Sequence, residues 1–417
     1  MNHPGQRIND ADPNAITIEE ATHRIFKSLT PCLETVAVAA SDSLGRVVAE
    51  DVLSGMDVPP FRASAMDGYA VRAAECTHPL SLEGQSLAGH PGADTIAPQS
   101  AQRITTGARV PDEADAVVQQ ENVTLEGGSI IVNQQPYTGL HIREPGTDTA
   151  KGAILIKAGE RIGPAECALL AAHGITQLSV VRKLVVAVFS TGDELVEPGQ
   201  VRSKGQINDA NRALLLSMLK DECVELIDLG IVADSESALQ RTVDASASAD
   251  LVVSSGGVSV GDADYVKAVL ERNGSMNLWK IAMKPGRPLT FGFLRPHCAF
   301  FGLPGNPVSA ALTCLLFVKP AIRHLCGMQP HSQPPLMLPL QGTLKKNPGR
   351  VEYQRALMFQ NDAGDWAVTT TGVQDSHVLS SLHKANCLIE LRVESTGAQP
   401  EDVVRVYPFT HFGRSPV

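Results

Sequence analysis

Residues 184–327 alternate short apolar segments with helical patterns, and this alternation restricts the possible folds more than any other feature of the chain. Segments of strand length lie at 184–190, 224–229, 251–254 and 299–303. Helical patterns lie at 211–219, at 237–247, at 264–272, and from Pro307 to near Gly327. Short apolar strands that alternate with helices are typical of a doubly wound parallel sheet. We therefore predict a central α/β domain.

The rest of the chain has a different pattern. Residues 16–29 repeat apolar side chains at helical spacing, and Thr17 with Glu20 resembles a capping box. A second helix is indicated between Pro164 and His173. Between these helices, short β-rich segments separated by Gly and Pro predict a small all-β module. Turn-rich short strands after residue 335 predict a terminal β-barrel or sandwich.

These patterns divide the chain into five parts. We expect a multi-domain protein of α/β and β parts: a disordered tail over 1–14, a discontinuous helical and mixed domain over 15–52 and 148–182, an inserted β-rich domain over 53–147, the α/β domain over 183–328, and a C-terminal β domain over 335–417.

Composition excludes several classes of protein. The 417 residues are 43% hydrophobic, which is enough to form several cores, and the net charge of −10 argues against a surface built to bind nucleic acid. No apolar segment approaches the ~18 residues of a membrane span, and the N-terminus lacks the pattern of a secretory signal. We therefore expect a cytoplasmic protein without membrane contact. The eight cysteines are scattered and predict small buried side chains rather than a metal site.

Three unusual loops follow predicted strands of the α/β domain. They are Thr191–Glu194, Ser255–Asp262 and Pro304–Pro307. Each alone fits an ordinary turn, because Gly, Pro and Asp are common turn residues. In an open parallel sheet, however, ligands bind beyond the carboxyl ends of the strands, where these loops meet. Three such loops at one edge therefore favour a ligand site.

The composition of the loops favours an anion held together with a metal ion. Glycines allow backbone N–H groups to approach phosphate oxygens. Four acids, Asp193, Glu194, Asp262 and Asp264, would repel a phosphate unless a divalent cation lies between them, and Mg²⁺ prefers such oxygen ligands. As an alternative, Asp262 or Asp264 caps the following helix. The lack of a Walker A or G-x-G-x-x-G motif disfavours P-loop NTPases and dinucleotide dehydrogenases.

A group of cations follows at Lys280, Lys284 and Arg287. Residues four apart point to the same side of a strand, so the two lysines are expected to share a strand face. Three cations beside acidic loops would hold a dianion, while the alternative is a solvated basic edge. Two motifs in the β-rich part, 64–71 and 103–108, are interpreted from their pattern alone as turns next to strands.

Taken together, these segments resemble the molybdopterin molybdenumtransferase family, which includes the E domain of gephyrin. The resemblance is carried, in order, by SAMDGYAV at 64–71, TTGARVP at 105–111, REPGTD at 143–148, STGDEL at 190–195, SSGGVSVGDADY at 254–265, KIAMKPGRP at 280–288 and GLPGNPVSA at 302–310. It extends from about Ile16 to the C-terminus.

The resemblance implies an elongated protomer of four subdomains whose α/β part is similar to molybdopterin adenylyltransferase. It implies a homodimer with the active site at the subunit interface, and transient contact with the adenylyltransferase. Members of the family take adenylylated molybdopterin and molybdate as substrates, insert the metal at the dithiolene and release AMP in a step that depends on Mg²⁺.

Roles follow from the matching motifs. The resemblance implies metal ligation by Asp193, Glu194, Asp262 and Asp264, and catalytic roles for Asp67, Thr106, Glu194, Asp264, Lys280 and Lys284. It implies substrate binding by Arg143, Asp148, Ser255, Gly256, Gly257, Ser259, Gly261, Arg287, Pro288, Pro304, Asn306, Pro307, Arg355 and Ser376. Many relatives carry Lys in place of Arg287, and the planar guanidinium suits a different arrangement of oxygens.

Two other functions fit the same chain. One is an adenylyltransferase-like nucleotide enzyme, which would consume ATP and release pyrophosphate. The other is a pterin-binding scaffold without catalysis. The mutually repelling acids and the cations favour an enzyme, because an idle site has no physical reason to keep them.

Overall fold

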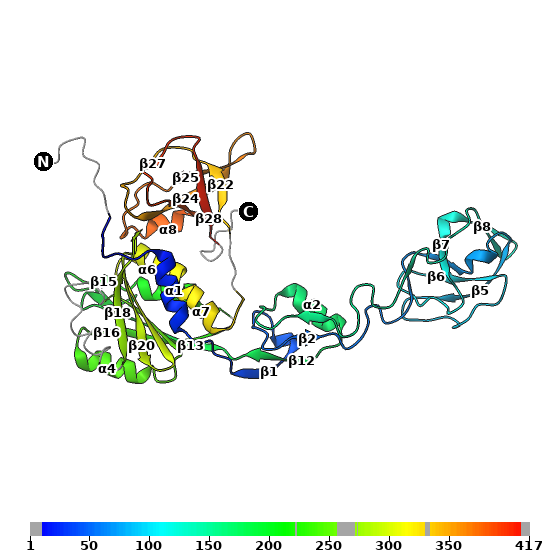
Figure 1. Ribbon diagram of the computed structural model, residues 1–417, viewed down its shortest axis with the longest axis horizontal. Helices are drawn as coiled ribbons and strands as arrows, with labels where there is room; N and C mark the ends of the chain where they lie inside the picture. Colours follow the sequence, from blue (N-terminus) through cyan, green and yellow to red (C-terminus); the bar gives the residue numbers. More distant parts are fainter. Residues whose placement is uncertain (1–10, 222, 257–271, 273, 330–333, 410–417) are drawn as a thin grey trace. The chain divides into compact units, whose positions relative to one another are not determined.

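The computed structural model describes residues 11–221, 223–256, 272, 274–329 and 334–409. The chain forms two compact units. The first contains 1–36, 45–47 and 180–417, and the second contains 37–44 and 48–179 (Figure 1). Residues 11–14 were expected in a disordered tail, but they form a turn that contacts the first unit through Asp12.

The first unit is built on a six-stranded sheet whose strand order is β16-β13-β17-β21-β20-β18. Its strands are β13 (Leu184–Thr191), β16 (Val224–Val232), β17 (Leu251–Ser255), β18 (Ser275–Lys280), β20 (Pro288–Arg295) and β21 (Cys298–Leu303). The strands β16, β13, β17 and β21 are parallel, as predicted. The sheet is nevertheless mixed, because β20 is antiparallel to both β21 and β18. Only Pro296 and His297 join β20 to β21, and a two-residue connection permits only an antiparallel pair.

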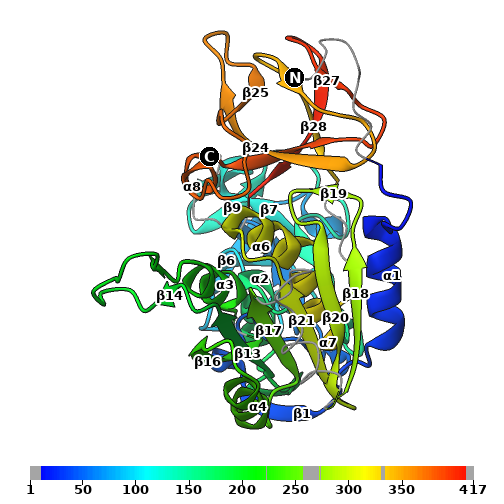
Figure 2. The ribbon, with the colours of Figure 1, turned by 90° about the vertical axis from the view of Figure 1, so that its left-hand side faces the viewer.

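The helices of this unit are α1 (Ile18–Ser28), α3 (Asn211–Leu219), α4 (Glu236–Ala245), α6 (Pro307–Thr313) and α7 (Lys319–Leu325), with a π-helical turn between the last two. The side chains of Ala187 and Phe189 pack with Leu239 and Val243 of α4 in one buried cluster. The contacts of α3 are with β13, β16 and α6 (Figure 2). Helix α1 was expected to group with residues 148–182. It clusters with the first unit instead, where Phe26 stacks on His324. The finer division into five parts stays a prediction.

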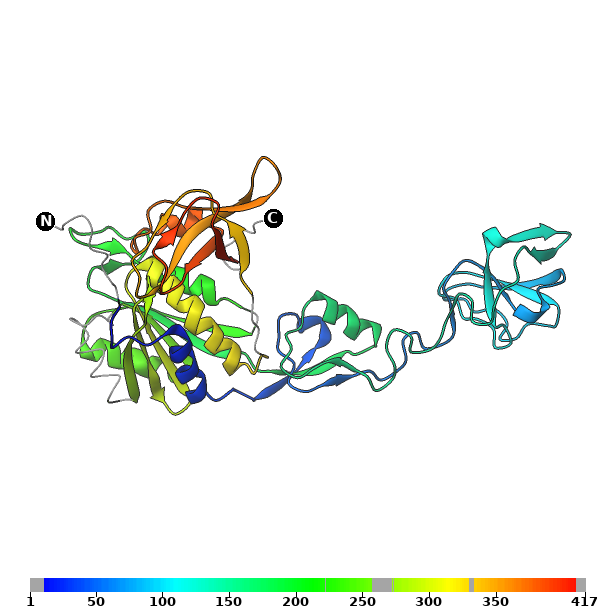
Figure 3. The ribbon, with the colours of Figure 1, turned by 45° about the horizontal axis from the view of Figure 1, so that its top comes forward.

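The C-terminal part of the first unit is rich in strands, as predicted. It contains β22 (Leu336–Pro339), β23 (Leu344–Lys345), β24 (Val351–Gln360), β25 (Trp366–Thr370), α8 (Ser380–Lys384), β26 (Cys387–Leu391), β27 (Gly397–Ala398) and β28 (Val403–Pro408) (Figure 3). A further short strand, β19 (Met283–Lys284), pairs in parallel with β24 and thus joins residues after β18 to this second sheet.

The second unit is also mainly β. A six-stranded sheet of order β7-β4-β6-β5-β9-β8 forms its largest element. The elements in and around this unit are β1 (Thr35–Ala39), β2 (Val52–Leu53), β3 (Ala63–Ser64), β4 (Gly68–Val71), β5 (Leu80–Ser86), β6 (Ser100–Ile104), β7 (Ala116–Gln119), β8 (Val123–Glu126), β9 (Ser129–Val132), β10 (Ile142–Arg143), β11 (Ile154–Ile156), α2 (Pro164–Ala172) and β12 (Gln177–Val181).

The longest apolar helical segment and most of the cysteines lie in the protein interior. The helical segment Pro307–Leu325 is long and apolar enough to cross a membrane, but 67% of it is buried inside the protein. A core helix gives the same signal. Six of the eight cysteines are buried, in agreement with their interpretation as small core side chains, while Cys32 and Cys167 are half-buried.

Candidate functional site

The carboxyl ends of β13, β17 and β21 lie next to one another, because these strands pair in parallel and in register. The chain leaves β13 toward β16 on one side and later returns to β17 on the other side. A crevice at such a reversal is the usual ligand position in this class of fold. The predicted loops after the three strands therefore meet at one edge.

Acidic side chains gather after β13. The hydroxyl of Thr191, the last residue of β13, donates to a carboxylate oxygen of Asp234. The backbone N–H of Asp234 donates to Oδ1 of Asp193 at 3.3 Å. The carboxylate of Glu194 folds over Gly192, since a Cβ built there would lie 2.7 Å from its Oε2. Sequence reasoning missed Asp234, because the segment after β16 has no glycine and its Asp, Ser and Glu fit an ordinary helix start before α4.

The loops after β17 and β21 are tied together by Asn211, the first residue of α3. Its Nδ2 donates to Ser255 Oγ at 2.8 Å and to the carbonyl oxygen of Gly305 at 2.7 Å. Gly256 is required here because its φ is +89° and because a Cβ would lie 2.4 Å from the Thr191 carbonyl oxygen. The structure therefore brings the predicted residue Gly256 into contact with the loop after β13.

Helix α6 links this edge to the C-terminal sheet. Pro304 is buried directly after β21, Asn306 is the residue before α6, and Pro307 is its first residue, so the three predicted residues lie where β21 leads into the helix. The backbone N–H of Val308 donates to the carbonyl oxygen of Ser376 at 3.1 Å. The loop that contains Ser376 leads into α8, and Figure 2 shows α8 next to α6.

Arg355 stabilises the loop that carries Ser376. This side chain is fully buried, with Nε donating to Ser381 Oγ at 3.0 Å and NH2 donating to the Asp375 carbonyl oxygen at 3.1 Å. Its third terminal nitrogen, NH1, has no partner within the described parts of the chain. Burial lowers the pKa of Arg355 to about 10. Arg355, which was predicted to bind substrate, therefore supports the loop around Ser376 from inside the protein.

The expected shared strand face of Lys280 and Lys284 is wrong. Lys280 is the last residue of β18 and pairs with Pro288, whereas Lys284 lies in β19 beside β24 of the other sheet. The N–H of Ile281 still continues the β18–β20 ladder by donating to the carbonyl oxygen of Arg287 at 2.7 Å, and from Met283 the chain pairs with β24 instead.

These cations, which we call the cation strip (Lys280, Lys284 and Arg287), still lie against the α6 region. A Cβ on the intervening Gly286 would lie 2.8 Å from Thr313 Oγ1 of α6. Lys284 Nζ is 3.4 Å from Glu352 Oε2, and both Lys280 and Arg287 pair with Asp12. A chain of contacts therefore connects the strip through α6 to the acidic edge.

The second unit brings two of its motifs together. The carboxylate of Asp67 accepts hydrogen bonds from the N–H of Thr106 at 2.6 Å and from its hydroxyl at 2.8 Å. These two bonds, with the nearby Arg103, hold the pKa of Asp67 below its usual value. Gly68, the first residue of β4, permits the close approach of strand β7, because a Cβ would lie 1.9 Å from the Val118 carbonyl oxygen. The sequence pattern alone indicated only turns here.

The other two predicted residues of the second unit, Arg143 and Asp148, pair with segments that precede Asp67 in the sequence. Arg143 is exposed and pairs with Ala63 in the short β10–β3 ladder. Asp148 is also exposed, and its N–H donates to the carbonyl oxygen of Val58 at 3.0 Å. The structure thus places Arg143 beside the segment that leads to Asp67.

The predicted residues Gly257, Ser259, Gly261, Asp262 and Asp264 lie outside the described residues. Within the described parts, no three His, Cys, Asp or Glu side chains are close enough to hold a metal ion. Asp193 and Glu194 nevertheless supply the hard carboxylate oxygens that Mg²⁺ prefers, so the chemistry of the donors fits this ion.

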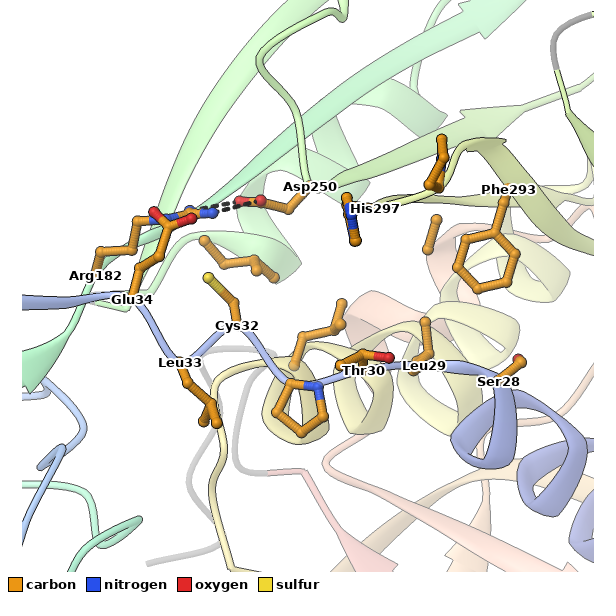
Figure 4. A pocket seen from close by; sticks show the side chains of 15 residues that line it. Ser28, Leu29, Thr30, Cys32, Leu33, Glu34, Arg182, Asp250, Phe293 and His297 are labelled. Atoms are coloured by element: carbon orange, nitrogen blue, oxygen red, sulfur yellow. Dashed lines mark hydrogen bonds and ion pairs between the residues drawn. The ribbon is translucent and has the colours of Figure 1, made fainter.

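A separate pocket of about 310 Å³ lies at the other end of the sheet. It is lined by residues at the amino ends of the parallel strands, such as Leu184 and Ala299, together with Cys32 and His297 (Figure 4). The guanidinium of Arg182 is paired there with Asp250 through two hydrogen bonds of 2.7 Å. Its position opposite the loop edge separates it from the predicted site.

Comparisons with known proteins give matches along almost the whole chain. The model of the MoeA N-terminal region (domain I and II) matches residues 16–174, that of a probable molybdopterin binding domain matches 187–324, and that of the MoeA C-terminal region (domain IV) matches 338–409.

Individual relatives agree with these domains. A molybdopterin molybdenumtransferase from Haemophilus influenzae is 41% identical over 401 residues, covering 95% of this chain and 99% of that protein. Gephyrin from Dictyostelium discoideum is 34% identical over 86% of this chain and 57% of gephyrin. The crystal structure of a molybdopterin biosynthesis MoeA protein from Pyrococcus horikoshii is 31% identical, covers 94% of this chain and 98% of that chain, and superposes with a TM-score of 0.77. The chain therefore belongs to the molybdopterin molybdenumtransferase family and is a transferase of molybdenum cofactor biosynthesis.

Proposed function

We propose that the chain inserts molybdate into adenylylated molybdopterin and releases AMP in a step that depends on Mg²⁺. The observation that carries this proposal is the continuous contact from the acidic loop after β13, through Gly256 and α6, to the cation strip. Such an arrangement can hold a metal oxyanion and a nucleotide phosphate side by side.

The cation strip is the proposed binding site of molybdate. Extracting a tetrahedral dianion from water needs several converging charged donors. Lys284 supplies one ammonium group, half-exposed and oriented by the buried Glu352 carboxylate at 3.4 Å. Arg287 supplies guanidinium N–H groups, and Ser376, held by Arg355, supplies a hydroxyl from the adjacent loop. Positive charge gathered on fixed backbone requires little reorganisation when the oxyanion binds.

The acidic loops are the proposed site of pyrophosphate cleavage. Asp193 and Glu194, together with Asp262 and Asp264, would hold Mg²⁺, which neutralises phosphate charge and stabilises the AMP leaving group. The Ser255–Gly261 loop would cradle the pterin or its phosphate, and its first residue, Ser255, accepts a hydrogen bond from Asn211. Asp67, Thr106, Arg143 and Asp148 of the second unit are proposed to contribute from a partner copy in a homodimer. We further place the protein in the cytoplasm, with transient delivery of substrate by molybdopterin adenylyltransferase.

The test uses purified protein with adenylylated molybdopterin, molybdate and Mg²⁺, and measures AMP. We expect Lys284→Ala to raise the molybdate concentration at half-maximal turnover about tenfold, since a charge-assisted hydrogen bond contributes about 1.5–3 kcal/mol. Lys284→Arg should restore most of the affinity, and Lys27→Ala, on the exposed end of α1, should have no effect.

An unchanged molybdate dependence in Lys284→Ala would remove the strip from the mechanism. Consumption of ATP with release of pyrophosphate would favour the adenylyltransferase-like function. Binding of the adenylylated pterin without AMP release would favour a scaffold.

A further inference from the structure

The carboxylate of Asp12 occupies the space between two cations of the strip. Its Oδ2 lies 3.8 Å from Lys280 Nζ and is hydrogen-bonded to NH2 of Arg287. The Asp12 side chain is only 15% exposed, whereas those of Lys280 and Arg287 are 49% and 40% exposed. An internal carboxylate therefore takes the position in which the proposed function requires an external oxyanion.

The backbone holds Asp12 in this position. The N–H of Ile16 donates to the carbonyl oxygen of Lys280 at 2.9 Å, and the N–H of Ala282 donates to that of Ile16 at 2.8 Å. The other carboxylate oxygen of Asp12 accepts from the N–H of Asn14 at 2.9 Å. The hydrogen bond from Asn14, followed by the charges of Arg287 and Lys280, lowers the pKa of Asp12. The group is thus ionised at neutral pH and tethered beside its cations.

The binding capacity of the two cations is not exhausted by this contact. Among the described residues, the ion pairs of Asp12 set two positive charges, those of Lys280 and Arg287, against one negative charge. Nε of Arg287 is buried and has no partner within the described parts of the chain. A ligand with two negative charges and several oxygens can therefore use donors that a single carboxylate leaves unused.

From this arrangement we infer that Asp12 is a specificity-determining residue of the oxyanion site, which excludes monoanions and yields to a tetrahedral dianion. The inference rests on the proposed function. A tethered carboxylate competes at an effective concentration of about 1 mM or more. A chloride or nitrate ion that displaces it only replaces one negative charge with another, and gains nothing. A dianion roughly doubles the Coulomb attraction and completes the charge balance.

The test measures binding of sodium molybdate to the full chain by isothermal titration calorimetry. Titrations are made at one ionic strength in sodium gluconate and in sodium chloride, so that the small monoanion is the only variable. The variant is Asp12→Asn, whose amide oxygen still accepts from the N–H of Asn14. Asp12→Ser is a second variant, and Asp362→Asn, an exposed carboxylate in the turn between β24 and β25, is the control.

In gluconate, we expect Asp12→Asn to bind molybdate about fivefold more tightly than the natural protein, because a partly exposed ion pair contributes up to about 1 kcal/mol. In chloride, the variant should lose about that factor, whereas the natural protein and Asp362→Asn should change less than twofold. Asp12→Ser should follow Asp12→Asn.

Weaker binding in both Asp12 variants would overturn the inference, since it would mean that the carboxylate positions the cations. Equal binding and equal sensitivity to chloride would overturn it as well. The AMP assay separates this failure from that of the proposed function. Normal AMP release with no effect of Asp12 rejects only the present inference, whereas no AMP release and no molybdate binding in any variant rejects both.

Discussion

Asn211 is the side chain whose removal should loosen the site with the least disturbance of the rest of the fold. It is half-buried, and its amide nitrogen joins Ser255 of the loop after β17 to Gly305 of the loop before α6. Asn211→Ala removes both bonds. Asn211→Asp keeps an acceptor for the Ser255 hydroxyl but places a carboxylate oxygen against the Gly305 carbonyl oxygen, so that it breaks the second bond selectively.

The two distances, 2.8 Å and 2.7 Å, describe well-formed hydrogen bonds. Each such bond contributes about 0.5–1.5 kcal/mol, so Asn211→Ala should lower the free energy of unfolding by about 1–3 kcal/mol. The displacement of the two loops should reduce turnover more strongly than it reduces stability. A displacement of about 1 Å in a positioning loop can reduce the rate by up to ~100-fold, and we expect a decrease of about tenfold for Asn211→Ala.

A double-mutant cycle with Ser255→Ala isolates one of the bonds. Urea unfolding should give a coupling energy of about 1 kcal/mol between the two positions, because within the described parts of the chain the Ser255 hydroxyl bonds to Asn211 alone. AMP release under single-turnover conditions should fall about as far in Asn211→Asp as in Asn211→Ala, because both variants lose the bond to Gly305. Zero coupling together with unchanged single-turnover rates would refute the reasoning that Asn211 holds these two loops in register.

Two predictions concern the second unit. Its hydrogen bonds from Thr106 hold the pKa of Asp67 below the ordinary value of 3.8, so their contribution to folding is present above about pH 4 and is lost as the pH falls through the lowered pKa. Thr106→Val removes the hydroxyl bond but keeps the backbone N–H bond, so it should raise the Asp67 pKa only part of the way toward 3.8 in a carboxyl NMR titration. An unchanged value would contradict the contribution of the hydroxyl. Gly68→Ala should destabilise the second unit by about 3 kcal/mol or more, because its Cβ would lie 1.9 Å from the Val118 carbonyl oxygen. Limited proteolysis would detect this loss, and Gly55→Ala, with open space around its Cβ, is the control.

Local patterns predicted the regular elements well. The helix expected over 211–219 is α3 with the same bounds, and Thr17 caps α1 by accepting from the N–H of Glu20 at 3.1 Å. These elements follow from capping and from the spacing of apolar residues, which short stretches of sequence contain. The antiparallel strands β18 and β20 could not be found in this way, because their place depends on pairing with β21.

The sequence predicted only those parts of the candidate site in which similar loop motifs follow several strands. The glycines and acids after β13, β17 and β21 indicated their common edge, since parallel strands bring these ends together. Asn211 carries no signal of its own, because its role depends on loops that lie 44 and 94 residues away in the sequence. Asp12 was missed for a related reason. Its contact with Arg287 joins segments 275 residues apart, and a polar N-terminal segment resembles a disordered tail.

Lys280 is the last residue of β18, a strand of the α/β sheet. Lys284 belongs to β19, which pairs with β24 of the C-terminal sheet. No single ladder of hydrogen bonds therefore fixes the spacing of their ammonium groups. A shear of the C-terminal strands against the α/β sheet would change this spacing directly and so alter how well the two charges fit one anion.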